Sequence, residues 1–141
     1  DPDLKLFDGV LPLIKRLREQ GLHTAVATGK SRFGLNQALE NHGIGDLFDV
    51  TKTADQTRSK PHPLMLEEIF DELMVTPAEC VMIGDTSHDI QMAQNAGCDS
   101  IAVSYGAHTL QEISKAEPSY IAHNVTELGH LLAMYSKKRA E

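Results

Sequence analysis

The chain has 141 residues, enough for one folded domain, with a net charge of −7 and 41% hydrophobic residues. The acidic balance excludes broad electrostatic attraction to nucleic acid or to an anionic membrane surface. No apolar run approaches the roughly 18 residues of a membrane span, and no signal peptide is visible. Cys80 and Cys98 are not in a C-x-x-C pair and are expected to be buried free thiols, which favours a reducing, cytosolic setting.

Helical and strand-like patterns alternate along the chain. Apolar residues at helical spacing, with capping residues and glycine stops, predict helices over residues 11–20, 31–42, 63–73, 87–95, 110–115 and 127–135. Short apolar runs between them predict strands over residues 23–28, 49–53, 80–83, 100–104 and 120–123. Strands that are apolar throughout and alternate with helices indicate a parallel sheet covered on both faces. We therefore expect one doubly wound, Rossmann-like α/β domain over residues 1–141.

Polar residues follow the predicted strands, at the edge where doubly wound sheets bind ligands. The first such segment is Thr28-Gly29-Lys30-Ser31. A nucleotide-binding P-loop is excluded, because that motif needs glycine where Thr24 stands. Two interpretations remain open: a strand-to-helix turn with Ser31 as the N-cap, or a phosphate site made by Thr28 and the backbone N–H groups that follow it.

Lys60 comes after the second predicted strand, directly before a helix whose first turn carries Pro61 and Pro63. A cation at a helix N-terminus opposes the helix dipole, at a cost of roughly 0.3–1 kcal/mol if it is exposed. A charge that is locally disfavoured at such an edge suggests a function. An anionic ligand or a group of carboxylates would compensate it.

The third segment, Gly84-Asp85-Thr86-x-x-Asp89, carries two carboxylates. Thr86 and Asp89 alone fit a capping box, which is a purely structural explanation for both. That explanation leaves Asp85 without a role, and a carboxylate that ends a buried strand is costly unless it is paired or binds a cation. Oxygen ligands without neighbouring histidine or thiolate ligands suit Mg²⁺. The segment therefore predicts a magnesium site at Asp85.

Together, Thr28 in AVATGKS, Lys60 in SKPHP and Asp85 and Asp89 in VMIGDTSHD resemble motifs II, III and IV of the haloacid dehalogenase-like (HAD) superfamily. The order and spacing fit, the resemblance covers essentially the whole chain, and it is closest to phosphoglycolate phosphatase-like enzymes. It implies a Mg²⁺-dependent phosphatase that acts on a small phosphorylated metabolite through an aspartyl-phosphate.

The resemblance also implies a role for each of these residues. Thr28 and Gly29 bind the phosphate, and Lys60 bridges the phosphate and the nucleophile. Asp85 binds Mg²⁺, and Asp89 is either a second ligand or orients one.

The chain departs from this family in one respect: the first motif, D-x-D-G-T, which supplies the nucleophile and the acid/base, is not found, and neither is the cap domain. Phe7-Asp8-Gly9 is not a substitute, because the nucleophile position would fall on Leu6, so Asp8 is interpreted as a turn residue. In the family, the nucleophile strand lies between those that carry motifs II and IV. We therefore expect the two halves of the sheet to lack their shared neighbour.

Because the chain also opens on Asp1 rather than Met, we expect it to be the C-terminal portion of a longer hydrolase and inactive alone. Two alternatives remain open. One is a non-catalytic HAD-like module that binds a phosphorylated ligand or a protein, and the other is a phosphomutase of the same superfamily.

Overall fold

The computed structural model of the chain describes residues 9–105 and 109–140, with side chains described up to residue 135. Its helices are α1 (Val10–Glu19), α2 (Arg32–His42), α3 (Leu64–Leu73), α4 (Ser87–Ala96), α5 (Leu110–Lys115) and α6 (Val125–Ala140). Its strands are β1 (Ala25–Thr28), β2 (Val50–Thr53), β3 (Val81–Gly84), β4 (Asp99–Val103) and β5 (Tyr120–Ala122). Each predicted helix and strand is confirmed, although α6 is longer than expected. Asp8 lies outside the described residues.

The first strand begins two residues later than the sequence predicts. The reason lies in Thr24, whose backbone N–H donates to the Asp49 carboxylate at 2.9 Å and whose carbonyl accepts from the Asp49 amide at 2.7 Å. Arg18 donates to the same carboxylate at 2.9 Å. These bonds join the end of α1 to the start of β2 and fix where the two strands begin to pair.

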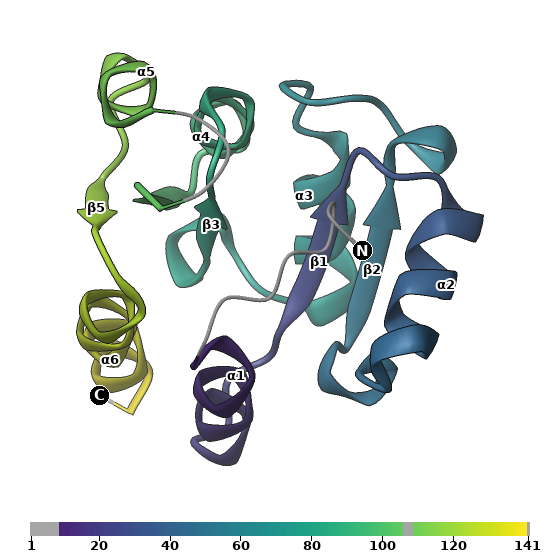
Figure 1. Cartoon of the computed structure of the whole chain (residues 1–141), viewed down its shortest axis with the longest axis horizontal. Helices are drawn as coiled ribbons and strands as arrows, with labels where there is room; N and C mark the ends of the chain where they lie inside the picture. Colours follow the sequence, from purple (N-terminus) through teal and green to yellow (C-terminus); the bar gives the residue numbers. More distant parts are fainter. Residues whose placement is uncertain (1–8, 106–108, 141) are drawn as a thin grey trace.

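The strands are parallel, as predicted, but they form two separate sheets in the described part of the chain. β1 pairs with β2 from Ala25↔Val50 to Thr28↔Thr53. The second sheet has the order β3-β4-β5, and β3 pairs with β4 from Val81↔Asp99 to Gly84↔Ala102. In Figure 1 the two sheets stand next to each other, with β1 facing β3. This break lies where the resemblance places the missing strand.

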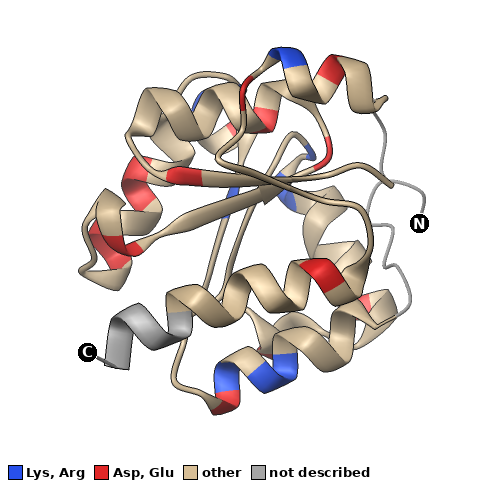
Figure 2. Ribbon diagram, turned by 90° about the vertical axis from the view of Figure 1, so that its left-hand side faces the viewer, with Lys and Arg blue, Asp and Glu red and all other residues tan. Residues whose placement is uncertain are grey.

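Helices cover both faces of the strands, as a doubly wound fold requires. Figure 2 shows the strands between two layers of helices, with acidic segments in both layers. On one side α3, α4 and α5 contact one another in sequence, and on the other α1 contacts α6. Each layer buries an apolar stripe against the sheets, and each side chain so buried contributes about 1.5–3 kcal/mol. The fully buried large side chains are Leu35, Met65, Ile90, Met92, Ile101, Ile113 and Thr53.

The remaining structural expectations concern the cysteines and membrane segments. Cys80 and Cys98 are free thiols, as predicted, but both are half-buried rather than buried. Among the residues described, no helix is both long enough and apolar enough to cross a membrane.

Candidate functional site

The polar segments singled out in the sequence follow β1, β2 and β3, whose carboxyl ends point to the same side of the molecule in Figure 1. Thr28 is the last residue of β1, and Asp85 comes directly after β3. The segment that carries Lys60 runs from β2 to α3. The parallel arrangement therefore gathers these residues at one edge, as the sequence predicts.

Lys60 and Asp89 form the central contact of this edge. The Lys60 ammonium donates to Asp89 Oδ1 at 2.5 Å, and the side chains are only 20% and 6% exposed. The unfavourable position of Lys60 before α3 is thus compensated by a carboxylate at the start of α4, 29 residues away in the sequence.

Asp89 has a second role through its other oxygen. Oδ2 accepts from the Thr86 backbone N–H at 3.3 Å and from the Thr86 hydroxyl at 3.0 Å, and Thr86 Oγ1 accepts from the Asp89 amide at 3.2 Å. The capping box of α4 is therefore present. One carboxylate ends up both capping the helix and positioning the lysine, so the structural and functional interpretations of this motif are compatible.

Gly84, the last residue of β3, allows this arrangement. A Cβ atom at residue 84 would lie 2.2 Å from Asp89 Cβ and 2.6 Å from Asp89 Cγ, far inside van der Waals contact. Only glycine lets the Asp89 side chain pack over the end of β3. The glycine of the GDTSHD segment is thus required by the position of the carboxylate.

The loop that carries Lys60 is held from α4 as well. Asn95 donates from its side-chain amide to the Pro61 carbonyl at 2.8 Å. Lys60 and the residue after it are both attached to α4, one through Asp89 and one through Asn95. Asn95 could not be predicted from the sequence, because nothing in the local pattern links it to a loop 34 residues earlier.

The turn after β1 confirms the first of the two interpretations that the sequence left open, the N-cap at Ser31, and the phosphate site at Thr28 stays a prediction. Ser31 is the N-cap of α2 and accepts from the Gly34 amide at 3.0 Å. The Thr28 hydroxyl oxygen accepts from the Lys30 amide at 3.1 Å, a bond that leaves the hydroxyl proton to be donated. A Cβ atom at Gly29 would meet nothing within 4 Å, so the surface above this turn is open.

The anion at the N-terminus of α2 is Asp55, which the local sequence pattern did not indicate. Both of its carboxylate oxygens accept from the Arg32 amide, the first amide of α2, at 3.1 Å, and Oδ1 also accepts from the Thr53 hydroxyl at 2.6 Å. The bond from the Thr53 hydroxyl, followed by that from the Arg32 amide, lowers the pKa of Asp55. Because Asp55 already occupies this helix end, a phosphate at the rim would be bound by the Thr28 hydroxyl rather than by the first amide of α2.

The carboxylates near the end of β3 fit Mg²⁺ in the chemistry of their donors. Asp85 and Asp89 offer only oxygen ligands, and the histidine between them, His88, has an exposed side chain. Both Asp89 oxygens are engaged, one by Lys60 and the other by Thr86. No cluster of three or more His, Cys, Asp or Glu side chains that could hold a metal occurs among the described residues.

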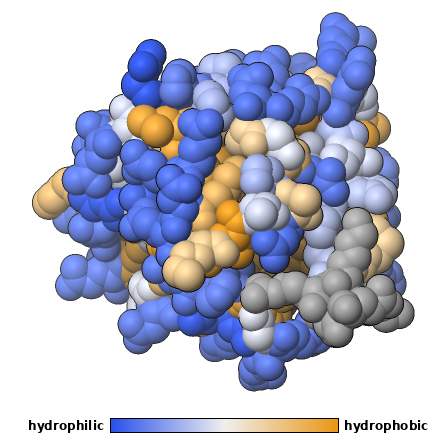
Figure 3. Space-filling model, turned by 180° about the vertical axis from the view of Figure 1, so that it is seen from behind, coloured by the Kyte–Doolittle hydropathy of each residue, from blue (hydrophilic) through white to orange (hydrophobic). Residues whose placement is uncertain are grey.

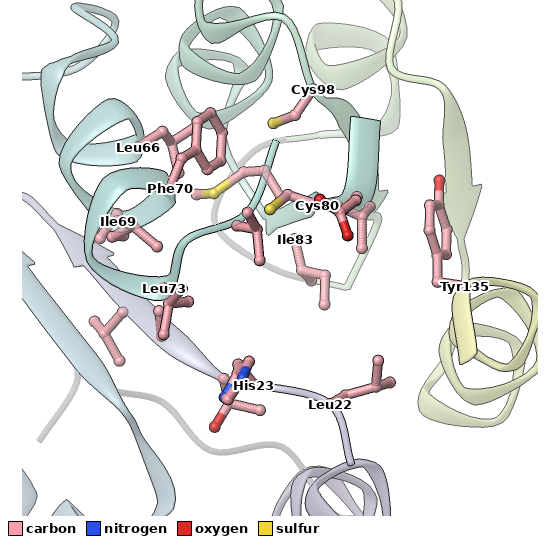
Figure 4. Close-up of a pocket in the computed structure, with 18 of the residues that line it drawn as sticks. Leu22, His23, Leu66, Ile69, Phe70, Leu73, Cys80, Ile83, Cys98 and Tyr135 are labelled. Carbon is pink, nitrogen blue, oxygen red and sulfur yellow. The ribbon is translucent and has the colours of Figure 1, made fainter. Parts of the chain in front are cut away.

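A groove of about 370 Å³ lies beside this edge rather than at it. It is lined by β1 and β3 and by helices on both sides, and neither Lys60 nor Asp85 lines it. The groove is mainly apolar, as Figure 4 shows for the side chains of α3, β3 and α6 around it. It is therefore a separate feature from the polar edge.

Comparison with known proteins gives a consistent result. Residues 1–103 match the family model described as haloacid dehalogenase-like hydrolase. The chain is 33% identical over 124 residues to a phosphoglycolate phosphatase of Vibrio vulnificus, covering 87% of this chain and 54% of that protein. It is 32% identical over 123 residues to the pyrophosphatase PpaX of Halalkalibacterium halodurans, covering 86% of this chain and 57% of the relative.

The solved structures agree with these relatives. A crystal structure described as a candidate phosphoglycolate phosphatase, from Lactobacillus delbrueckii subsp. bulgaricus, superposes with a TM-score of 0.82 at 32% identity. The match covers 89% of this chain and 52% of that one. The chain thus spans about half the length of the relatives that it matches.

Proposed function

The chain belongs to the haloacid dehalogenase-like hydrolase family, and on that premise we propose that it carries the phosphate- and Mg²⁺-binding part of a phosphomonoester hydrolase. The observation that carries the proposal is the Lys60–Asp89 contact at the carboxyl edge of the strands, with Thr28 and Asp85 at the same edge. A lysine held by a carboxylate is fixed in position, where its remaining N–H donors can contact an anionic substrate.

Each residue has a specific task in the proposed reaction. Thr28 donates its hydroxyl proton to a phosphate oxygen while its own oxygen is held by the Lys30 amide. Gly29 leaves room for the phosphate above the turn. Lys60 neutralises charge on the transferring group, and Asp89 keeps the Lys60 ammonium in place.

Asp85 would hold Mg²⁺, together with ligands from outside the described residues. When bound, the ion would neutralise charge that develops on the phosphoryl group. The proposed nucleophile is a carboxylate that lies outside this chain and forms an aspartyl-phosphate, which water then hydrolyses.

The proposed substrate is a small phosphomonoester. Relatives of this chain are a phosphoglycolate phosphatase and a pyrophosphatase, so both phosphoglycolate and pyrophosphate are candidates to be tested. A structural neighbour described as a β-phosphoglucomutase is 20% identical, which shows the fold alone.

The test compares this chain with a longer protein that contains it. We expect the 141-residue chain to release no phosphate from p-nitrophenyl phosphate, and the longer protein to release it from that substrate or from phosphoglycolate in the presence of Mg²⁺. Asp85→Asn and Lys60→Met should lower turnover of the longer protein by at least about 100-fold, as is common when a charged group that stabilises the transition state is removed.

Lys52→Met is the matched control, because the Lys52 ammonium pairs with Glu68 and Glu72 of α3 rather than with a residue of the candidate site, so this variant should leave turnover unchanged. Turnover by the 141-residue chain itself, abolished by Asp85→Asn, would contradict the proposal that the nucleophile lies elsewhere. A longer protein that binds phosphate without hydrolysing any phosphomonoester would instead support the non-catalytic module.

A further inference from the structure

The two cysteines of the chain lie opposite each other at the start of the second sheet. Cys80 directly precedes β3 and Cys98 directly precedes β4, and the first residues of these strands, Val81 and Asp99, are partners in the parallel register. Extending this register by one residue places Cys80 opposite Cys98. The backbone of Cys80 is extended, with φ −118° and ψ 153°, which suits such a continuation.

Both thiols belong to the same face of that sheet. Side chains alternate between the two faces along a strand, so Met82 shares the face of Cys80. Cys80, Met82 and Cys98 all pack against one apolar cluster from α3 and α4, whereas Val81 packs against a cluster that contains residues of α1 and α6. The pKa of the Cys98 thiol is raised to about 12 by burial and, second, by the neighbouring Cys80 thiol, which also places the two sulfurs near each other.

The groove lined by β1 and β3 gives a small ligand access to this pair. Cys80, Met82 and Cys98 line it, and both thiols are half-buried. Figure 4 shows both cysteine side chains at the opening, between Phe70 of α3 and Tyr135 of α6. Hydrophobic atoms also reach the surface in the middle of the rear face (Figure 3), so an apolar opening alone does not indicate a ligand. The paired thiols are the feature that distinguishes the groove.

The spacing of the strands decides which bridge fits between the two sulfurs. Neighbouring strands lie about 4.8 Å apart, so the Cβ atoms of opposed side chains are separated by roughly that distance. A disulfide needs Cβ atoms about 3.5–4.5 Å apart and an S–S bond of about 2.05 Å, so it would form only if the strands moved together. An ion with two metal–sulfur bonds of about 2.3 Å spans up to about 4.6 Å, which matches the strand spacing.

The donors at this pair select a soft cation that needs few ligands. Thiolate and thioether sulfur favour Cu(I), zinc and iron–sulfur clusters. Zinc sites and iron–sulfur clusters take four protein ligands. Within residues 9–105 and 109–135, no three His, Cys, Asp or Glu side chains form a group that could hold a metal. A monovalent soft ion, by contrast, is satisfied by two thiolates in a line.

We propose that Cys80 and Cys98 form a site for one soft monovalent cation of the Cu(I) class, held between two thiolates across the start of β3 and β4. On binding, two S–H bonds break, two metal–sulfur bonds form and two protons pass to solvent, with no transfer of electrons. Cys80 and Asp85 lie at opposite ends of β3, about 16 Å apart at the rise of a parallel strand. The site is therefore separate from the candidate phosphate edge and does not rest on the proposed function.

The experiment titrates the reduced 141-residue protein with Cu(I), without phosphate or Mg²⁺, in competition with the coloured chelator bathocuproine disulfonate. We expect one ion per chain. Because two protons are released for each ion bound, the affinity should rise about 100-fold from pH 6 to pH 7. X-ray absorption of the bound copper should show sulfur neighbours only.

Variants identify the two ligands. Cys80→Ser and Cys98→Ser should each weaken Cu(I) binding at least about 100-fold, since even the loss of a residue that only orients a metal ligand costs about 10–100-fold. Met74→Leu is the matched control, because this sulfur is 89% exposed and does not line the groove, and it should leave the affinity unchanged, as should Asp85→Asn. If a serine variant fails to fold, the alanine variant at the same residue replaces it, and X-ray absorption of the unaltered chain tests the ligands without any variant.

Binding of two ions per chain, or nitrogen or oxygen neighbours at the copper, would overturn the proposal. So would a variant at either cysteine that binds Cu(I) as tightly as the unaltered chain, or Zn²⁺ that displaces Cu(I) at equal concentration. Loss of Cu(I) binding in Asp85→Asn would place the ion at the candidate phosphate edge and would equally refute a separate site.

Discussion

Replacing Asp89 by asparagine tests the contact on which the candidate site depends. Asparagine keeps a side-chain oxygen that can accept from Thr86, so the capping box of α4 is retained while the charge opposite Lys60 is lost. Removing one partner of a buried ion pair costs about 3–5 kcal/mol, because the other charge is left uncompensated. The Lys60 side chain is 20% exposed and can gain some hydration, so the expected loss is smaller, about 2–3 kcal/mol.

The assay is urea unfolding of the full chain. With a denaturant slope of about 1–3 kcal/mol per M, this loss lowers the midpoint by roughly 1 M urea. Glu72→Gln is the matched control: it removes the charge from a pair with Lys52, but Glu72 is 51% exposed, and exposed pairs contribute about 0–1 kcal/mol.

A double-mutant cycle separates the pair from effects of either residue alone. Lys60→Met in the Asp89→Asn background removes the uncompensated cation, so the double variant should be more stable than the sum of the two single losses by about 1–3 kcal/mol. Two results would refute the reasoning: a midpoint for Asp89→Asn equal to that of the unaltered chain, or strictly additive losses in the cycle.

Three further outcomes follow from the structure. Gly84→Ala should lower the free energy of unfolding by about 1–3 kcal/mol, because the new Cβ would lie 2.2 Å from Asp89 Cβ. Gly45→Ala, whose new Cβ would meet nothing within 4 Å, should change it by less than about 0.5 kcal/mol. Both are measured by urea unfolding, and equal losses would contradict the packing argument. Burial, and after it the neighbouring Cys80 thiol, raises the pKa of Cys98 from 9.0 to about 12, so the thiolate fraction of Cys98 at pH 8 is roughly 10³-fold smaller than in the unfolded chain. Alkylation of Cys98, followed by mass spectrometry, should therefore be much slower in the folded protein than in urea, and equal rates would refute this. The pKa of Asp55 is lowered, so its bonds to the first turn of α2 are present at neutral pH and are lost as the pH falls through that lowered pKa, below 3.8. Protection of the first α2 amide against hydrogen exchange should decrease in that pH range, and Asp55→Asn should remove this pH dependence.

The sequence predicted the order and type of the elements well because helices and parallel strands are set by local periodicity and by stop signals. The doubly wound arrangement followed from apolar strands that alternate with helices. Boundaries were less accurate where tertiary bonds decide them, as at Thr24, whose backbone bonds with Asp49 delay the start of β1. The separation of the strands into two sheets came only from the family resemblance, because no local pattern encodes a missing neighbour.

The single residues of the candidate site could be predicted from the sequence, whereas the hydrogen bonds between them could not. The position of Lys60 before a helix indicated that an anion must compensate it, but local sequence could not specify Asp89, because the two are brought together by packing of α3 against α4. Asp55 and Asn95 were missed for the same reason: each acts on an element more than 20 residues away, and neither has a local capping pattern. Residues that act through long-range hydrogen bonds leave no periodic signal.

The most direct test of the central claim, that Thr28, Lys60 and Asp85 form a phosphate- and Mg²⁺-binding edge, is a ³¹P NMR titration of inorganic phosphate with the full chain. We expect a broadening or shift of the phosphate signal that is stronger with Mg²⁺, is lost in Lys60→Met and Thr28→Val, and is kept in Lys52→Met. An equal response in all of these variants, or one that is indifferent to Asp85→Asn in the presence of Mg²⁺, would contradict it.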